Sequence, residues 1–119
     1  MAKILVVDDS HSVRSMLNFL LQNDHDVTEA ENGEDALEKA KENQVDLVLS
    51  DVNMPKMDGI TLISELRKIE SYKLTPILVL TTESGRDMKA RGREAGATGW
   101  VVKPFQPENL VKMIDRVLQ

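Results

Sequence analysis

The sequence predicts a doubly wound α/β domain, in which a parallel sheet of five strands carries helices on both faces. Strand-like apolar runs alternate five times with longer segments whose apolar residues recur at helical spacing. The runs that begin at Lys3 and Leu47 are apolar at consecutive positions, which is typical of strands buried on both faces of a parallel sheet. The 119 residues contain no linker, repeat or low-complexity segment, so residues 1–119 are predicted to form one domain.

The first two strand–helix units are predicted from apolar periodicity and capping residues. The apolar run from Lys3 ends at two aspartates, and a helix follows with Ser10 as its cap and apolar positions up to Leu21. A short, half-polar strand over residues 26–30 has the composition expected near a sheet edge. The dipeptide Asn32-Gly33 then opens the second helix.

The third and fourth units follow the same pattern. A strand over residues 47–51 leads through a loop to a helix with apolar residues at 60, 63, 66 and 69. A strand over residues 77–80 precedes a weaker helix over residues 85–95. Gly92 inside that helix costs roughly 1 kcal/mol relative to alanine.

The last unit is a strand over residues 99–102 followed by a helix that begins at Pro107. Proline suits the first turn of a helix, because the missing N–H would have had no partner there. The apolar residues of this helix that are expected to face inward are Leu110, Ile114, Val117 and Leu118.

Composition excludes several classes of protein. The chain is 41% apolar and 29% charged, as in ordinary globular domains, and it contains no cysteine, so it has neither disulfides nor thiolate metal sites. A net charge of −5 argues against nucleic acid as a direct partner. No segment is long and apolar enough to span a bilayer, and the first residues do not form a signal peptide. A cytoplasmic location without membrane binding is therefore expected.

Five polar residues fall at the carboxyl ends of predicted strands, and these are Asp8, Asp9, Asp51, Thr81 and Lys103. The carboxyl ends of parallel strands share one edge of a sheet, which is where such folds bind ligands. Alone, the first two aspartates would equally suit a turn and helix cap. Three carboxylates that meet there would repel one another by roughly 4 kcal/mol per pair at ~4 Å and a dielectric near ~20. Mg²⁺ relieves such repulsion, and a strand-end aspartate can act as a nucleophile toward phosphorus.

At these residues the chain resembles the receiver domain of bacterial two-component response regulators. Within that family it is most similar to stand-alone chemotaxis regulators of the CheY type, because nothing follows the fifth helix and because Asn53 and Glu83 match that subgroup. The resemblance implies a flavodoxin-like sheet with strand order 2-1-3-4-5. The motifs that carry it are Val6–Ser10, Ser50–Pro55, Met57–Gly59, Leu80-Thr81 and Val102–Phe105.

The resemblance implies a metal site and a phosphoacceptor. Asp51 would receive the phosphoryl group and also contact Mg²⁺, for which Mn²⁺ can substitute. Asp9 would bind the ion directly, Asp8 directly or through water, and the backbone carbonyl of Asn53 would supply a further oxygen. The side chains of Asn53 and Glu83 would tune access of water to the phosphoryl group.

The resemblance also implies roles for three residues on the last two strands. The Thr81 hydroxyl would donate to the phosphoryl group, and the Lys103 ammonium would pair with Asp51 and that group. The Lys103-Pro104 bond matches the family's cis peptide. Trp100 occupies the switch position, where tyrosine or phenylalanine is common; it would turn inward when Thr81 moves, or else simply fill the sheet edge.

The function implied is a phosphorylation-activated signalling switch, not an enzyme with an external substrate. A sensor histidine kinase would supply the phosphoryl group, and the chain would catalyse only its own phosphorylation and dephosphorylation. Output would pass through the face formed by the fourth helix, fifth strand and fifth helix, to the flagellar motor switch if the pathway is chemotaxis. A phosphatase is a further expected partner, and the chain is expected to be monomeric. The alternatives are a phosphate sink or relay and a receiver fragment of a larger regulator.

Two rival functions of other classes are disfavoured by particular residues. A flavodoxin-like electron carrier cradles its phosphate in a loop after the first strand, where this chain places Asp8 and Asp9. An aspartyl-phosphate phosphatase of the haloacid-dehalogenase type needs an acid two residues after its nucleophile. This chain has Asn53 there, and an amide does not act as a general acid or base.

Overall fold

The computed structural model describes residues 2–119. Within them, five strands alternate with five α-helices, and a short 3-10 helix follows the third α-helix. In chain order the elements are β1 (Lys3–Val7), α1 (His11–Leu21), β2 (Asp26–Ala30), α2 (Gly33–Glu42), β3 (Leu47–Ser50), α3 (Gly59–Arg67), η1 (Glu70–Tyr72), β4 (Ile77–Thr81), α4 (Arg86–Ala95), β5 (Gly99–Val102) and α5 (Pro107–Leu118).

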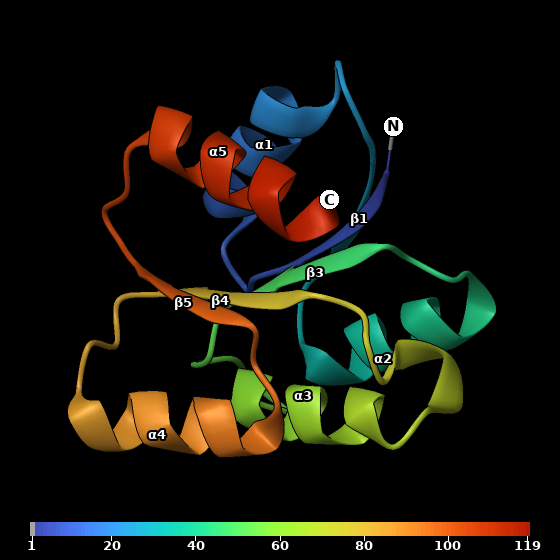
Figure 1. Ribbon diagram of the computed structural model, residues 1–119, viewed down its shortest axis with the longest axis vertical. Helices are drawn as coiled ribbons and strands as arrows, with labels where there is room; N and C mark the ends of the chain where they lie inside the picture. Colours follow the sequence, from blue (N-terminus) through green and yellow to red (C-terminus); the bar gives the residue numbers. More distant parts are fainter. Residues whose placement is uncertain (1) are drawn as a thin grey trace.

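The strands form one parallel sheet in the order β2-β1-β3-β4-β5, which confirms the predicted topology. Helices α1 and α5 cover one face, and α2, α3 and α4 cover the other (Figure 1). β2 lies at an edge, as its half-polar sequence predicts, whereas β1, β3 and β4 lie inside the sheet and are almost wholly buried. None of the helices within residues 2–119 has the length and apolar character needed to cross a bilayer.

Two hydrophobic clusters, one on each face of the sheet, hold the helices in place. On β1, Ile4 and Val6 pack with residues of α1 and α5, while Leu5 and Val7 pack with residues of α2 and α3. Successive side chains of a strand point to opposite faces, so a continuously apolar strand serves both clusters. Burial of one such side chain contributes about 1.5–3 kcal/mol relative to its exposure.

The structure corrects two boundaries. β3 ends at Ser50, so Asp51 lies just beyond the strand and not within it. α3 ends at Arg67, whereas the apolar pattern had predicted that it reaches Ile69. The chain turns early because the Arg67 guanidinium donates to the backbone oxygens of Tyr72 at 2.6 Å and Thr75 at 2.7 Å, which draws the following segment back against the helix.

Tyr72 joins three segments that are distant in sequence, a role that the sequence did not reveal. Its side chain is buried. The hydroxyl donates to the backbone oxygen of Ala40 at 2.7 Å and accepts from the backbone N–H of Val45 at 3.0 Å. The end of α2 and the segment that leads into β3 are therefore both held by one phenol on η1.

Replacing Tyr72 by phenylalanine is expected to lower the free energy of unfolding by about 1–3 kcal/mol, because two buried backbone groups lose their partner. Burial raises the pKa of the Tyr72 hydroxyl above its ordinary value; the bond from Val45 opposes the shift and the charge of Asp46 adds to it. A raised pKa in the folded state means that this stabilisation is present below a pH of about 10 and is lost as the pH rises through the folded pKa.

Urea unfolding of wild type and Tyr72→Phe at neutral and alkaline pH measures both effects. The difference in stability should shrink at alkaline pH, where the wild-type phenol ionises. A difference that stays constant across this range would contradict the account of Tyr72.

Candidate functional site

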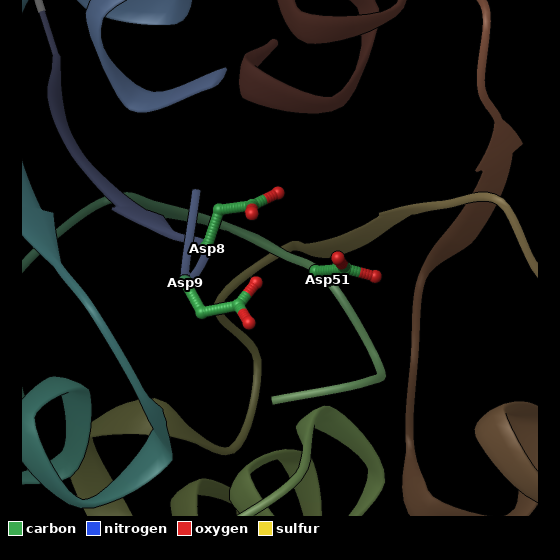
Figure 2. Close-up of side chains that lie close together, drawn as sticks. All are labelled: Asp8, Asp9 and Asp51. Atoms are coloured by element: carbon green, nitrogen blue, oxygen red, sulfur yellow. The ribbon is translucent and has the colours of Figure 1, made fainter. Parts of the chain in front are cut away.

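The acidic cluster lies at the carboxyl edge of the sheet. Asp8 and Asp9 follow β1, and Asp51 follows β3, which pairs directly with β1. One carboxylate oxygen of each residue lies within 4.8 Å of the others. Figure 2 shows Asp8 and Asp9 side by side at the end of β1, with their carboxylates extending toward the side on which Asp51 lies. Asp8 is buried, Asp51 half-buried and Asp9 exposed, so the cluster opens to solvent on one side.

Asp8 is held on several sides. Its carboxylate accepts from the backbone N–H of Ser10 at 2.9 Å and from the ammonium of Lys103 at 2.8 Å. Its own N–H donates to the backbone oxygen of Ala30 on β2 at 3.1 Å. Because the side chain is only 4% exposed, the charge of Lys103 offsets part of the cost of burying this carboxylate.

Asp51 is anchored by its backbone and by one carboxylate oxygen. Its N–H donates to the backbone oxygen of Val7 at 3.0 Å, and its Oδ1 accepts from the N–H of Val52 at 2.7 Å. Gly59, the first residue of α3, packs against the backbone of Asp51. A Cβ on Gly59 would lie 2.1 Å from the backbone oxygen of Asp51, so only glycine fits this close approach. The second carboxylate oxygen, Oδ2, is directed to Lys103.

Lys103 reaches the cluster from the end of β5. Its N–H donates to the backbone oxygen of Thr81 at 2.8 Å, and the Lys103–Pro104 bond is cis. Its ammonium lies 2.8 Å from Asp8 and 3.5 Å from Asp51. The sequence suggests Asp51 as the partner of Lys103, whereas the structure places Asp8 nearer. A nearby cation stabilises the more deeply buried carboxylate more, because that carboxylate has lost more of its hydration.

Thr81 ends β4, and Glu83 and Asn53 lie in the adjoining loops. Thr81 is buried at the end of β4, and its hydroxyl oxygen accepts from the N–H of Glu83 at 3.3 Å. The exposed Asn53 amide donates to the Glu83 carboxylate at 3.2 Å, a contact that the sequence did not predict. This pair links the loop after β3 to the loop after β4.

Trp100 on β5 contacts the loop after β4 on one side and helix α4 on another. Its indole Nε1 donates to the backbone oxygen of Glu83 at 2.9 Å. A Cβ on Gly92 would lie 2.5 Å from Cζ3 of the ring, so α4 packs onto the indole at a glycine. This contact explains why α4 carries a glycine despite its cost to the helix.

The donor set fits a small, hard cation. Carboxylate oxygens are among the ligands that Mg²⁺ prefers, and one oxygen from each of the three aspartates lies within 4.8 Å of the others. The chain offers no thiolate, because it lacks cysteine. Within residues 2–119, no other group of three His, Asp or Glu side chains meets the same spacing.

Comparisons with known proteins agree with the fold. A family model described as the response regulator receiver domain matches residues 4–115. The structure of the chemotaxis protein CheY4 of Vibrio cholerae superposes with a TM-score of 0.94 at 48% identity, with 98% of each chain covered. A putative response regulator from Chloroflexus aurantiacus superposes with a TM-score of 0.92 at 36% identity, over 98% of this chain and 97% of its own.

Curated relatives extend beyond the region of similarity. The transcriptional regulatory protein ResD of Bacillus subtilis is 39% identical over 118 residues, which are 98% of this chain and 48% of that protein. The transcriptional regulatory protein SrrA of Staphylococcus aureus is 36% identical over the same share of each chain. This chain therefore spans about half the length of the curated relatives it matches.

Proposed function

Because the chain belongs to the response regulator receiver domain family, we propose that it is a phosphorylation-activated switch and that Asp51 is its phosphoacceptor. Receiver domains are signalling phosphoacceptors and not enzymes in the usual sense. One observation supports Asp51 above the other acids. It is half-buried at the end of the central strand β3, with one oxygen held by Val52 and the other beside Lys103. Asp8 is buried and paired, and Asp9 is exposed.

The proposed reaction is in-line displacement at phosphorus. A carboxylate oxygen of Asp51 forms the new O–P bond, the P–N bond of a phosphohistidine breaks, and the leaving imidazole takes up a proton. Lys103 would offset negative charge beside the acceptor oxygen, and the Thr81 hydroxyl would donate to the transferred group. Asp8, Asp9, Asp51 and the backbone oxygen of Asn53 would hold Mg²⁺, which offsets charge on the phosphoryl oxygens when bound.

Return to the resting state would be hydrolysis of the acyl phosphate by water. We assign the control of that step to Asn53 and Glu83, which meet through the bond from the Asn53 amide to the Glu83 carboxylate at the exposed side of the site. Self-catalysed phosphorylation and dephosphorylation would be the chain's only reactions.

The signal would pass from Thr81 to Trp100 and the face formed by α4, β5 and α5. Thr81 and Trp100 share Glu83, since its N–H donates to the Thr81 hydroxyl and its carbonyl accepts from the indole. Movement of Thr81 toward a phosphoryl group would disturb both bonds. Any turn of the indole away from its present position would also have to break its bond to Glu83, which adds to the stability of that position.

The partners that we propose are a sensor histidine kinase, an output protein and a phosphatase. Chemotaxis, with the flagellar motor switch as output, is supported by the similarity to the chemotaxis protein CheY4. A place in a larger transcriptional regulator is supported by the length and the names of ResD and SrrA. A phosphate sink or relay is the remaining alternative. We further propose that residues 1–119 act as one monomeric domain in the cytoplasm, without direct contact to nucleic acid or membrane.

Affinity capture separates these alternatives. Wild type and Asp51→Asn, each treated with acetyl phosphate, serve as bait in extract of the source cells. A flagellar motor protein retained only by phosphorylated wild type would support chemotaxis. Recovery of kinases or phosphotransferases alone would support the sink or relay.

Removal of Mg²⁺ is expected to abolish phosphorylation. Intact mass after incubation with acetyl phosphate should show a phosphoryl increment in Mg²⁺ or Mn²⁺ and none in EDTA, because the three carboxylates would otherwise repel the anionic donor. Addition of excess Mg²⁺ to the EDTA sample controls for damage to the protein. An equal increment in EDTA would refute the metal-dependent mechanism.

A further inference from the structure

We propose that Arg14 is a positioning residue for the metal-binding pair Asp8 and Asp9, an assignment that rests on the proposed function. Arg14 lies in α1, and its guanidinium reaches back to the turn between β1 and α1. Its Nη1 donates to the backbone oxygen of Asp8 at 2.6 Å, and its Nε donates to Oε1 of Glu29 on β2 at 3.2 Å. With its side chain only 14% exposed, Arg14 is part of the packed structure beside the acidic cluster.

The oxygen that Arg14 holds belongs to the peptide unit that joins Asp8 to Asp9. This unit is planar, so the direction of its oxygen determines the orientation of the plane that carries both Cα atoms. The carboxylates that would share the ion project from those two atoms. The Asp8 N–H donates to the backbone oxygen of Ala30, and its carboxylate accepts from the N–H of Ser10. Arg14 binds the oxygen of the Asp8–Asp9 peptide unit itself.

The guanidinium is in turn fixed by Glu29. The second carboxylate oxygen of Glu29 accepts from the amide of Asn18 at 2.9 Å, and its backbone oxygen accepts from the ammonium of Lys39 on α2 at 2.5 Å. Arg14 therefore connects the acidic turn to a network that spans α1, β2 and α2. A guanidinium presents its donors in a rigid fork, whereas an ammonium is a point charge and does not reproduce the same two-acceptor geometry.

Charge and position predict opposite effects on metal affinity. Removal of a cation near an acidic cluster strengthens the local attraction for Mg²⁺ if charge alone matters. Loss of the hydrogen bond that orients the ligands weakens binding, typically 10–100-fold for such supporting contacts. The direction of the change in Mg²⁺ affinity therefore separates the two roles.

The test is calorimetric titration of the whole chain with Mg²⁺, comparing wild type with Arg14→Met and Arg14→Lys. Arg14→Met is expected to raise the dissociation constant about 10-fold. Arg14→Lys keeps the charge but loses the fork, and it should also bind more weakly than wild type. Arg91→Met, on the exposed side of α4, removes the same charge elsewhere and should bind as wild type does. Urea unfolding in EDTA verifies that each variant is folded.

Equal or tighter binding by Arg14→Met, or wild-type affinity in a folded Arg14→Lys, would overturn the positioning role while leaving the proposed function intact. Failure of wild type itself to bind Mg²⁺ is a different result, which would overturn both. The lysine variant keeps the proposal testable if the methionine variant does not fold.

Discussion

Asp51→Asn is expected to abolish phosphorylation by acetyl phosphate. An amide in place of the carboxylate offers no anionic oxygen to attack phosphorus, although it keeps the size of the side chain and its bond from Val52. The variant should also gain stability in EDTA, because one of three mutually repelling carboxylates is removed. Intact mass after treatment with Mg²⁺ and acetyl phosphate measures the first effect, and urea unfolding in EDTA measures the second.

Asp46→Asn is the matched control for this change. Asp46 is exposed before the start of β3, at the opposite end of the strand from Asp51, and its carboxylate accepts from the N–H of Lys3 at 2.8 Å. An asparagine oxygen can accept the same bond, so the fold should be kept and phosphorylation should match wild type. A full phosphoryl increment on Asp51→Asn would place the acceptor at another residue.

Gly59→Ala is expected to damage the fold and the site together. The added Cβ would lie 2.1 Å from the backbone oxygen of Asp51. Because the position of a Cβ is set by the backbone, rotation of a side chain does not relieve this clash. Overpacking of this kind should lower the free energy of unfolding by about 3 kcal/mol or more. Any shift that relieves it moves α3 or Asp51, and a nucleophile displaced by about 1 Å can lose on the order of 100-fold in rate.

Gly85→Ala provides the control for Gly59→Ala, because a Cβ at that position meets no atom within 4 Å. Its stability and phosphorylation rate should lie close to those of wild type. Urea unfolding and the time course of the phosphoryl mass increment measure both variants. Wild-type behaviour of Gly59→Ala would mean that the approach of α3 to Asp51 is less restrictive than the structure indicates.

The succession of strands and helices along the chain could be predicted from the sequence because its signals are local and repeated. Continuously apolar β1 and β3, the Ser10 cap and the proline that opens α5 each encode their element within a few residues. The acids could be placed at one edge because parallel strands end together. The family resemblance supplied the strand order, which local periodicity does not encode.

The features that escaped prediction depend on contacts between distant segments. Tyr72 donates to the backbone oxygen of Ala40 and Arg67 to that of Gly96, both about 30 residues away, and no spacing rule assigns such bonds. The early end of α3 follows from the Arg67 contacts and not from the apolar pattern of the helix. The nearness of Lys103 to Asp8 depends on the relative burial of two carboxylates, which only the folded arrangement determines.

Chemical location of the phosphoryl group tests the central claim most directly. Wild-type protein is phosphorylated with acetyl phosphate in Mg²⁺ and treated with borohydride, which reduces an acyl phosphate to an alcohol, and the peptides are then mapped by mass. Reduction of Asp51 alone, absent when EDTA replaces Mg²⁺, is the predicted result. Reduction at Asp8 or Asp9, or stable modification of a residue that is not an aspartate, would contradict the assignment of Asp51 as phosphoacceptor.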